Sequence, residues 1–236
     1  MQTATAGRSA TRSPIARFFA STLGRKAVMA LTGVVMFGFL VGHLAGNLLM
    51  FAGKNPATNL YRMDEYAKAL HDLPALVWGT RLVLLLSVAA HIWAAVSLTA
   101  VSKAARPVAY KVVTPQQATL ASKFMKYGGF LLLAFIVYHL LHFTVGTAHG
   151  DFKPGQVYAN VVYAFSQPIV VGAYLVAMTS LCLHLYHGLY SFFQTLGFSH
   201  PTYTPRLRIG ARIVALALAA GFISIPLAVL AGVIPA

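Results

Sequence analysis

Six of the nine histidines in this chain lie inside long apolar runs, where an ionisable side chain needs a partner. They are His43, His91, His139, His142, His184 and His187. The first and second runs have one histidine each, the third and fourth have two each, and a fifth run has none. No Asp or Glu lies in any of these runs, so the imidazoles have no carboxylate to pair with. Imidazole is a common metal ligand, and four helices that each offer one predict a shared external partner, which we interpret as iron.

The five apolar runs are long enough, at roughly 20 residues each, to cross a bilayer as helices. They cover residues 27–51, 80–102, 127–147, 168–195 and 209–233. The chain of 236 residues is 58% hydrophobic and 9% charged, which leaves too little polar surface for a soluble globule of this size. We therefore predict an all-α membrane protein with a haem-binding four-helix core and a fifth helix. A basic segment, residues 1–26, is expected to precede a single transmembrane domain, residues 27–236.

The net charge of +14 does not indicate nucleic-acid binding. Bases and acids are concentrated in alternate segments between the apolar runs, as they are on the two sides of membrane proteins. Three segments contain bases and no acid: the N-terminal segment and the links between runs two and three and between runs four and five. Their bases are Arg8, Arg12, Arg17, Arg25, Lys26, Lys103, Arg106, Lys111, Lys123, Lys126, Arg206, Arg208 and Arg212. The four acids, Asp64, Glu65, Asp72 and Asp151, lie in the other two links. The positive-inside rule then predicts an N-terminus inside and a C-terminus outside.

The depths of the histidines predict two haem sites. Haem iron takes an axial ligand on each side, so two haems need four histidines on four helix faces. Towards the outer ends of their runs, His43 lies 8 residues before Phe51 and His139 lies 8 before Thr147. Towards the inner ends, His91 lies 12 residues before Lys103 and His184 lies 11 before Thr195. Helix rise is about 1.5 Å per residue, so these counts predict an outer pair and an inner pair at matching depths. His142 competes with His139 for the outer haem, because it lies only three residues further on.

Small residues near the histidines favour a flat ligand. Gly46 and Asn47 share the face of His43 and are expected to leave room for a porphyrin. Gly128 and Gly146 lie on the face of His139, which favours His139 over His142 as the ligand. The alternative is that these glycines simply let helices approach closely.

Four motifs also resemble a known family. GHLAGN (42–47), AAHIW (89–93), VYHLLHF (137–143) and LHLYHGLYSFFQTLG (183–197) occur in the order found in the dihaem cytochrome b membrane anchors of succinate dehydrogenases and fumarate reductases of the single-anchor, five-helix type. The resemblance covers roughly residues 20–233. It implies that the fourth ligand is His184 and not His187, and that the third is His139.

The resemblance also implies a division of labour. A flavoprotein subunit would oxidise succinate, and an iron–sulfur subunit would pass electrons to quinone in the membrane part, which contains two haem b groups. Menaquinone is the implied acceptor, and the bacterial cytoplasmic membrane is the implied location. One departure is Cys182, which stands where some fumarate-reducing relatives have a membrane-embedded Glu used for proton transfer. Because no span contains an acid, we expect that proton route to be unused.

The quinone site is less readable from the sequence. Ser21 and Arg25, four residues apart at the inner start of the first span, are candidates to bind a quinone carbonyl or a haem propionate, as similar pairs do in distant two-subunit anchors. The alternative is an interfacial arginine that obeys the positive-inside rule.

Two other classes of protein fit part of the pattern. A dihaem cytochrome b of a formate dehydrogenase or hydrogenase would share the histidine pairs, and a non-redox transporter would use the histidines for protons or metal ions.

Residues 157–168 predict a short helix on the outer surface or an extension of the fourth span.

Overall fold

The computed structural model describes residues 13–105 and 120–235, and this part of the chain is all-helical. The elements are α1 (Pro14–Ala20), α2 (Thr22–Asn47), the 3-10 helix η1 (Leu48–Ala52), α3 (Arg62–His71), α4 (Pro74–Ala104), α5 (Leu120–Leu140), the π-helix η2 (Leu141–Val145), α6 (Val157–Phe165), α7 (Pro168–Thr195) and α8 (Thr204–Leu230). Five of these helices are long and apolar enough to cross a membrane, which confirms the predicted all-α fold with five spans. Four of the bases that are predicted to lie on the inner side are outside the described residues: Arg8, Arg12, Arg106 and Lys111.

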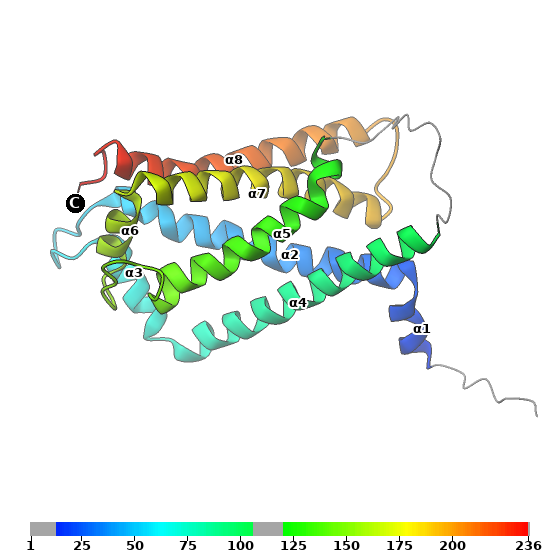
Figure 1. The fold of residues 1–236 in the computed structure, drawn as a ribbon, viewed down its shortest axis with the longest axis horizontal. Helices are drawn as coiled ribbons and strands as arrows, with labels where there is room; N and C mark the ends of the chain where they lie inside the picture. Colours follow the sequence, from blue (N-terminus) through cyan, green and yellow to red (C-terminus); the bar gives the residue numbers. More distant parts are fainter. Residues whose placement is uncertain (1–12, 106–119, 236) are drawn as a thin grey trace, which may run out of the picture.

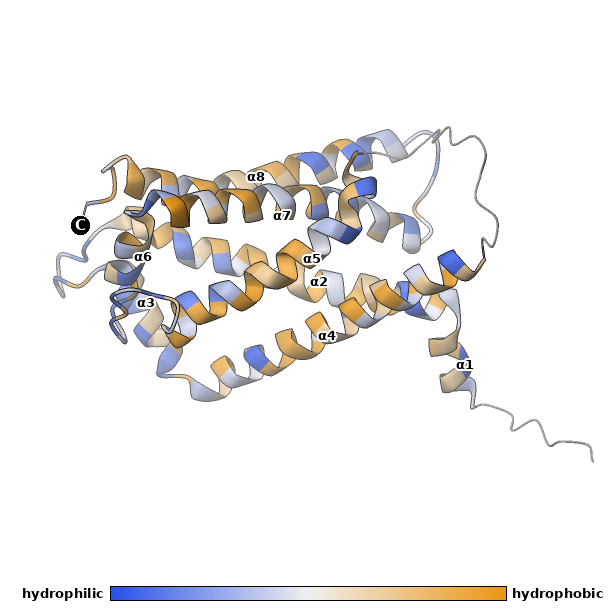
Figure 2. Cartoon of the chain, in the orientation of Figure 1, coloured by the Kyte–Doolittle hydropathy of each residue, from blue (hydrophilic) through white to orange (hydrophobic). Residues whose placement is uncertain are grey.

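The five long helices run side by side along the length of the molecule (Figure 1). Helix α4 packs on α2, α5 packs on α7, and α7 packs on α8. The short helices α3 and α6 and the C-terminal end gather at one end of the bundle, whereas α1 lies at the opposite end. The long helices are apolar over most of their length, and hydrophilic residues are frequent towards their ends (Figure 2).

Helix starts follow the local sequence. The side chain of Ser21 caps α2 by accepting a hydrogen bond from the backbone N–H of Gly24 at 2.9 Å. Helices α4 and α7 begin at Pro74 and Pro168, where the missing proline N–H is no loss. Pro226 lies inside α8, which nevertheless continues to Leu230.

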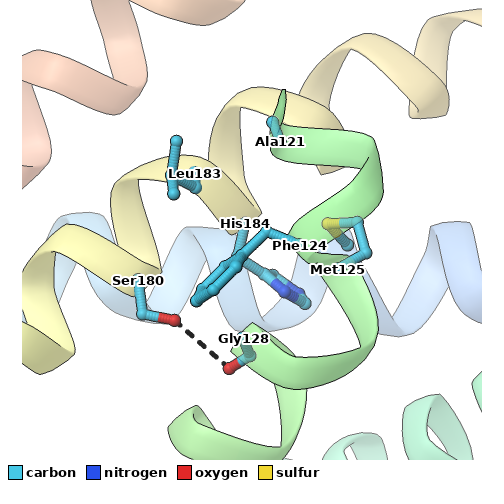
Figure 3. Close-up of a pocket in the computed structure, with 7 residues that line it drawn as sticks. All are labelled: Ala121, Phe124, Met125, Gly128, Ser180, Leu183 and His184. Carbon is cyan, nitrogen blue, oxygen red and sulfur yellow. Dashed lines mark hydrogen bonds between the residues drawn. The ribbon is translucent and has the colours of Figure 1, made fainter. Parts of the chain in front are cut away.

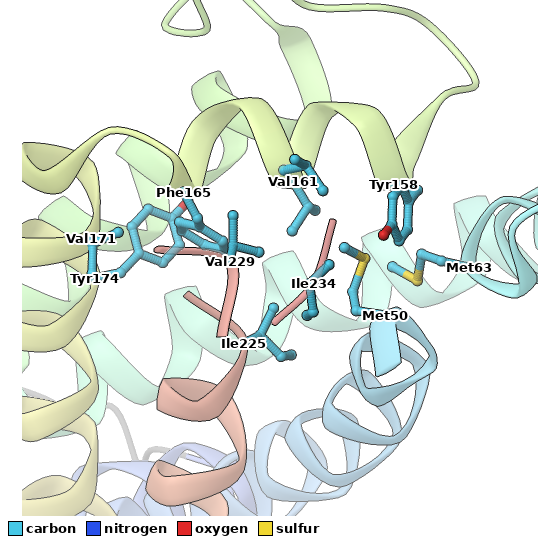
Figure 4. Packing of buried hydrophobic residues seen from close by; sticks show 11 residues of the cluster. Met50, Met63, Tyr158, Val161, Phe165, Val171, Tyr174, Ile225, Val229 and Ile234 are labelled. Atoms are coloured by element: carbon cyan, nitrogen blue, oxygen red, sulfur yellow. The ribbon is translucent and has the colours of Figure 1, made fainter. Parts of the chain in front are cut away.

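Helix α6 exists as predicted, and its apolar face packs on the end of the bundle. Tyr158, Val161, Val162 and Phe165 are 3–8% exposed and pack into a cluster with residues of η1, α3, α7 and α8 (Figure 4). The apolar face of α6 thus covers the end of the bundle because that is where other apolar side chains lie. Residues 166–167 separate α6 from α7, so α6 is not an extension of the fourth span.

Helix α3 was not predicted. It has Asp64 and Glu65 in its first turn and Lys68 and His71 in its last turn, the arrangement that the helix dipole favours. This charge pattern is the signal by which the sequence could have shown it.

Candidate haem sites

The structure brings together the two histidine pairs that were predicted from depth. The ring centroids of His43 on α2 and His139 on α5 are 5.9 Å apart, and those of His91 on α4 and His184 on α7 are 6.2 Å apart. Two imidazoles on one metal ion place their centroids about 6 Å apart, because each metal–nitrogen bond is about 2 Å long. The spacing in both pairs therefore suits one iron between the rings.

Each imidazole pair joins two helices that do not pack closely on each other. The close helix contacts in the described chain are α2 with α4, α5 with α7, and α7 with α8. The pairs instead connect α2 with α5 and α4 with α7. All four rings are only partly buried by protein atoms. Imidazoles that face each other between separated helices fit a flat group held between the helices.

Two of the four rings use Nδ1 for a hydrogen bond within the protein. Nδ1 of His139 is 3.2 Å from the Tyr174 hydroxyl, and Nδ1 of His91 is 3.1 Å from the Thr32 hydroxyl. This leaves Nε2 of both rings for a metal, the usual arrangement for a histidine ligand. The ring of His43 has no hydrogen bond in the described residues, and it stacks on Phe39 at a centroid distance of 5.2 Å.

The fourth ring, His184, has an unmet hydrogen-bonding capacity. Its Nδ1 is buried without a partner. Ser180, one turn earlier on α7, donates instead to the Gly128 carbonyl at 3.3 Å (Figure 3). The space between His184 and its neighbours on α5 and α7 has no room for a water molecule. Buried polar atoms are normally satisfied, so this nitrogen is an exception to the rule.

The other two histidines of the spans have protein partners. His142 is 3% exposed, lies within η2, and has the rings of Tyr138, Phe143 and His149 around it at centroid distances of 4.3–5.1 Å. His187 shares a hydrogen bond with Ser191, one turn further along α7, at 3.1 Å. Neither ring faces a candidate ligand on another helix as His139 and His184 do.

The interpretation of the glycines was wrong. A Cβ on Gly46 would lie 2.6 Å from the ring of Tyr66, so this glycine makes room for α3 and not for a porphyrin. A Cβ on Gly128 would lie 3.1 Å from Ser180 Oγ, and Gly146 has a φ of +86° and packs against Phe152. Neither glycine distinguishes His139 from His142, because small residues show only that something is close and not what it is.

Ser21 and Arg25 both have structural partners. The Ser21 hydroxyl donates to the Phe18 carbonyl at 2.7 Å as well as capping α2. Arg25 donates to the carbonyls of Phe19 at 3.3 Å and Ser97 at 3.5 Å, which ties the start of α2 to α4. Their assignment as a quinone-binding pair stays a prediction.

The four acids lie in segments at the other end of the bundle from Ser21 and Arg25, and each makes a hydrogen bond or an ion pair there. Asp64 accepts a hydrogen bond from the backbone N–H of Tyr158 at 2.8 Å and so caps α6. Glu65 accepts hydrogen bonds from Thr58 and Asn55, which hold the pKa of its carboxyl below the usual range. Two exposed ion pairs, Lys68–Asp72 and Lys153–Asp151, involve the other two acids.

A family model for the succinate dehydrogenase/fumarate reductase transmembrane subunit matches residues 100–224. The chain belongs to this family. Members are membrane subunits of an oxidoreductase complex, generally haem-binding cytochromes b, and work with flavoprotein and iron–sulfur subunits; the membrane subunit is not itself catalytic. His139 and His184 fall within the matched residues, and His43 and His91 precede them. Neither the search of the curated proteins nor the search of the solved structures found a match.

Proposed function

We propose that this family member is the dihaem, single-anchor cytochrome b of a succinate:quinone oxidoreductase. The two imidazole pairs at 5.9 and 6.2 Å carry the proposal. His43 and His139 would hold the outer haem b, and His91 and His184 the inner one. When bound, the haems supply one-electron transfer between the iron–sulfur subunit and a quinone, for which we propose menaquinone.

The chain's own residues would bind and orient these groups. Tyr174 and Thr32 engage Nδ1 of His139 and His91 and so keep the two rings turned towards their partners. Phe39 and Phe222 flank His43 at centroid distances of 5.2 and 5.9 Å and exclude water from its surroundings. Burial of this kind is one way in which a protein sets a haem potential.

Charge placement supports the proposed orientation in a bacterial cytoplasmic membrane. The described bases Arg17, Lys103, Lys123 and Arg206 lie where α1, α4, α5 and α8 meet one end of the bundle, and all four acids lie in the segments at the other end. The basic end would face the cytoplasm, where the flavoprotein and iron–sulfur subunits would dock.

Spectroscopy on the purified protein tests the proposal. We expect two haem b per chain, with sharp reduced α bands. The His91→Ala variant should lose one haem, and the His187→Ala variant, whose ring has a partner within α7, should keep both. A wild-type chain without haem would favour a non-redox transporter. Two haems with a co-purifying formate dehydrogenase or hydrogenase, in place of a flavoprotein that oxidises succinate, would favour that other class of cytochrome b.

Quinone and proton chemistry need separate tests. If Ser21 contacts the quinone, Ser21→Ala should weaken the apparent affinity for quinone; unchanged quinone reduction would remove Ser21 from the site.

Cys182 borders a groove of 360 Å³ with Tyr186 and Arg212, and no carboxylate lines it. We therefore expect no compensating transmembrane proton uptake through this position in proteoliposomes.

A further inference from the structure

Tyr174 on α7 lies between two histidines of the third span. Its hydroxyl oxygen is 3.2 Å from Nδ1 of His139 and also 3.2 Å from Nδ1 of His142. The tyrosine is 6% exposed, and its ring is held edge-on by Phe135 at 5.0 Å and by Phe165 at 4.9 Å. Figure 4 shows Phe165, from α6, beside the Tyr174 ring. The position of this hydroxyl is therefore fixed by packing from α5 and α6.

The proton count gives the two hydrogen bonds a direction. A tyrosine hydroxyl has one proton, so it donates to one imidazole and accepts from the other. A histidine that binds a metal through Nε2 has its proton on Nδ1. His139 would therefore donate to the Tyr174 oxygen, and Tyr174 would donate to Nδ1 of His142.

We infer that Tyr174 is a positioning residue for the outer haem ligand, and that His142 is the acceptor that completes its hydrogen-bond chain. The inference rests on the proposed outer haem between His43 and His139. A hydrogen bond from Nδ1–H raises the electron density on a ligand imidazole, which favours the oxidised iron. Tyr174 thus lowers the midpoint potential of the outer haem. His142 strengthens this effect because it polarises the hydroxyl.

The inner pair offers a matched comparison. Thr32 Oγ1 is 3.1 Å from Nδ1 of His91 and donates its own proton to the Val28 carbonyl at 2.7 Å. It therefore accepts from His91, as Tyr174 accepts from His139. Tyr138 is the control for a lost phenol: its ring stacks on His142 at 5.1 Å, but its hydroxyl makes no hydrogen bond in the described residues.

The test is a redox titration, with haem quantification, of the whole membrane complex. The outer haem is identified as the one that His43→Ala loses. In Tyr174→Phe we expect both haems to remain and the potential of the outer haem to rise. A tenfold change in the preference for oxidised over reduced iron corresponds to about 59 mV. Thr32→Val should raise only the inner potential, and Tyr138→Phe should change neither.

The outcomes distinguish a failure of the proposed haem function from a failure of the role of Tyr174. A wild-type complex without haem overturns the proposed function itself. Two retained haems with unchanged potentials in Tyr174→Phe overturn the role of Tyr174 and leave the proposed function intact. If Tyr174→Phe loses the outer haem, His142→Ala decides instead: a raised outer potential supports the chain, and unchanged potentials overturn it. Loss of a haem from His142→Ala contradicts the assignment of His139 as the ligand.

Discussion

Replacing His139 and His142 one at a time tests the least obvious assignment in the proposed sites, because the two residues are only three apart. His139 faces His43 at a centroid distance of 5.9 Å, whereas His142 is enclosed by the rings of Tyr138 and His149. His139→Ala removes one of the two proposed outer ligands, and no other imidazole of the described chain faces His43. We therefore expect haem content to fall from two per chain to one.

His142→Ala is expected to keep both haems and to lose stability. The substitution removes a buried ring and leaves the Tyr174 hydroxyl without its acceptor, and an unsatisfied buried group of this kind costs about 1–3 kcal/mol. The assay is the ratio of haem to protein in the purified complex, followed by redox titration and thermal unfolding. Two haems in His139→Ala together with one in His142→Ala would refute the reasoning.

Three further predictions concern the fold and are checked by unfolding experiments. Gly46→Ala should destabilise the protein by about 1–3 kcal/mol, because a Cβ there meets the ring of Tyr66, whereas Gly42→Ala meets nothing within 4 Å and should be tolerated. Asp64→Ala should cost about 1 kcal/mol, because it removes the cap of α6, and should leave haem content unchanged. Because its hydrogen bonds lower the pKa of Glu65, this group stabilises the fold above its ordinary pKa of 4.5, and the contribution is lost as pH falls through the lowered value. Glu65→Gln should therefore reduce the loss of stability on acidification, and an unchanged acid profile would contradict this.

The spans and the histidine pairs were predictable because each leaves a strong local signal. An apolar run of sufficient length has few alternatives to a membrane helix, and a histidine inside such a run is conspicuous because its burial in lipid is costly. Matching depths then paired His43 with His139 and His91 with His184 without knowledge of the helix packing. The span at residues 168–195 has the same bounds as α7, because Pro168 marks its start.

The residues that support these histidines were not predictable in the same way. Tyr174 is one of 11 tyrosines, and nothing in its local sequence distinguishes it from tyrosines that only pack. Its role depends on α5 and α7 lying side by side and on α6 folding back against its ring. Thr32 is likewise 59 residues from His91 in the chain. Contacts of this kind depend on tertiary packing and not on local pattern.

The burial of the spans indicates why the proposed haems would matter to this bundle. In the most apolar stretch of each span, 6–11% of residues in α2, α4 and α5 are buried within the protein, against 33% in α7 and α8. Helix α4 packs closely on α2 but reaches α7 through the pair His91 and His184. In lipid there is no hydrophobic driving force to bring such helices together, so association depends on packing and polar contacts. A flat group ligated from both sides would supply both, and the proposed haems would therefore join the α2–α4 pair to the α5–α7–α8 layer as well as transfer electrons.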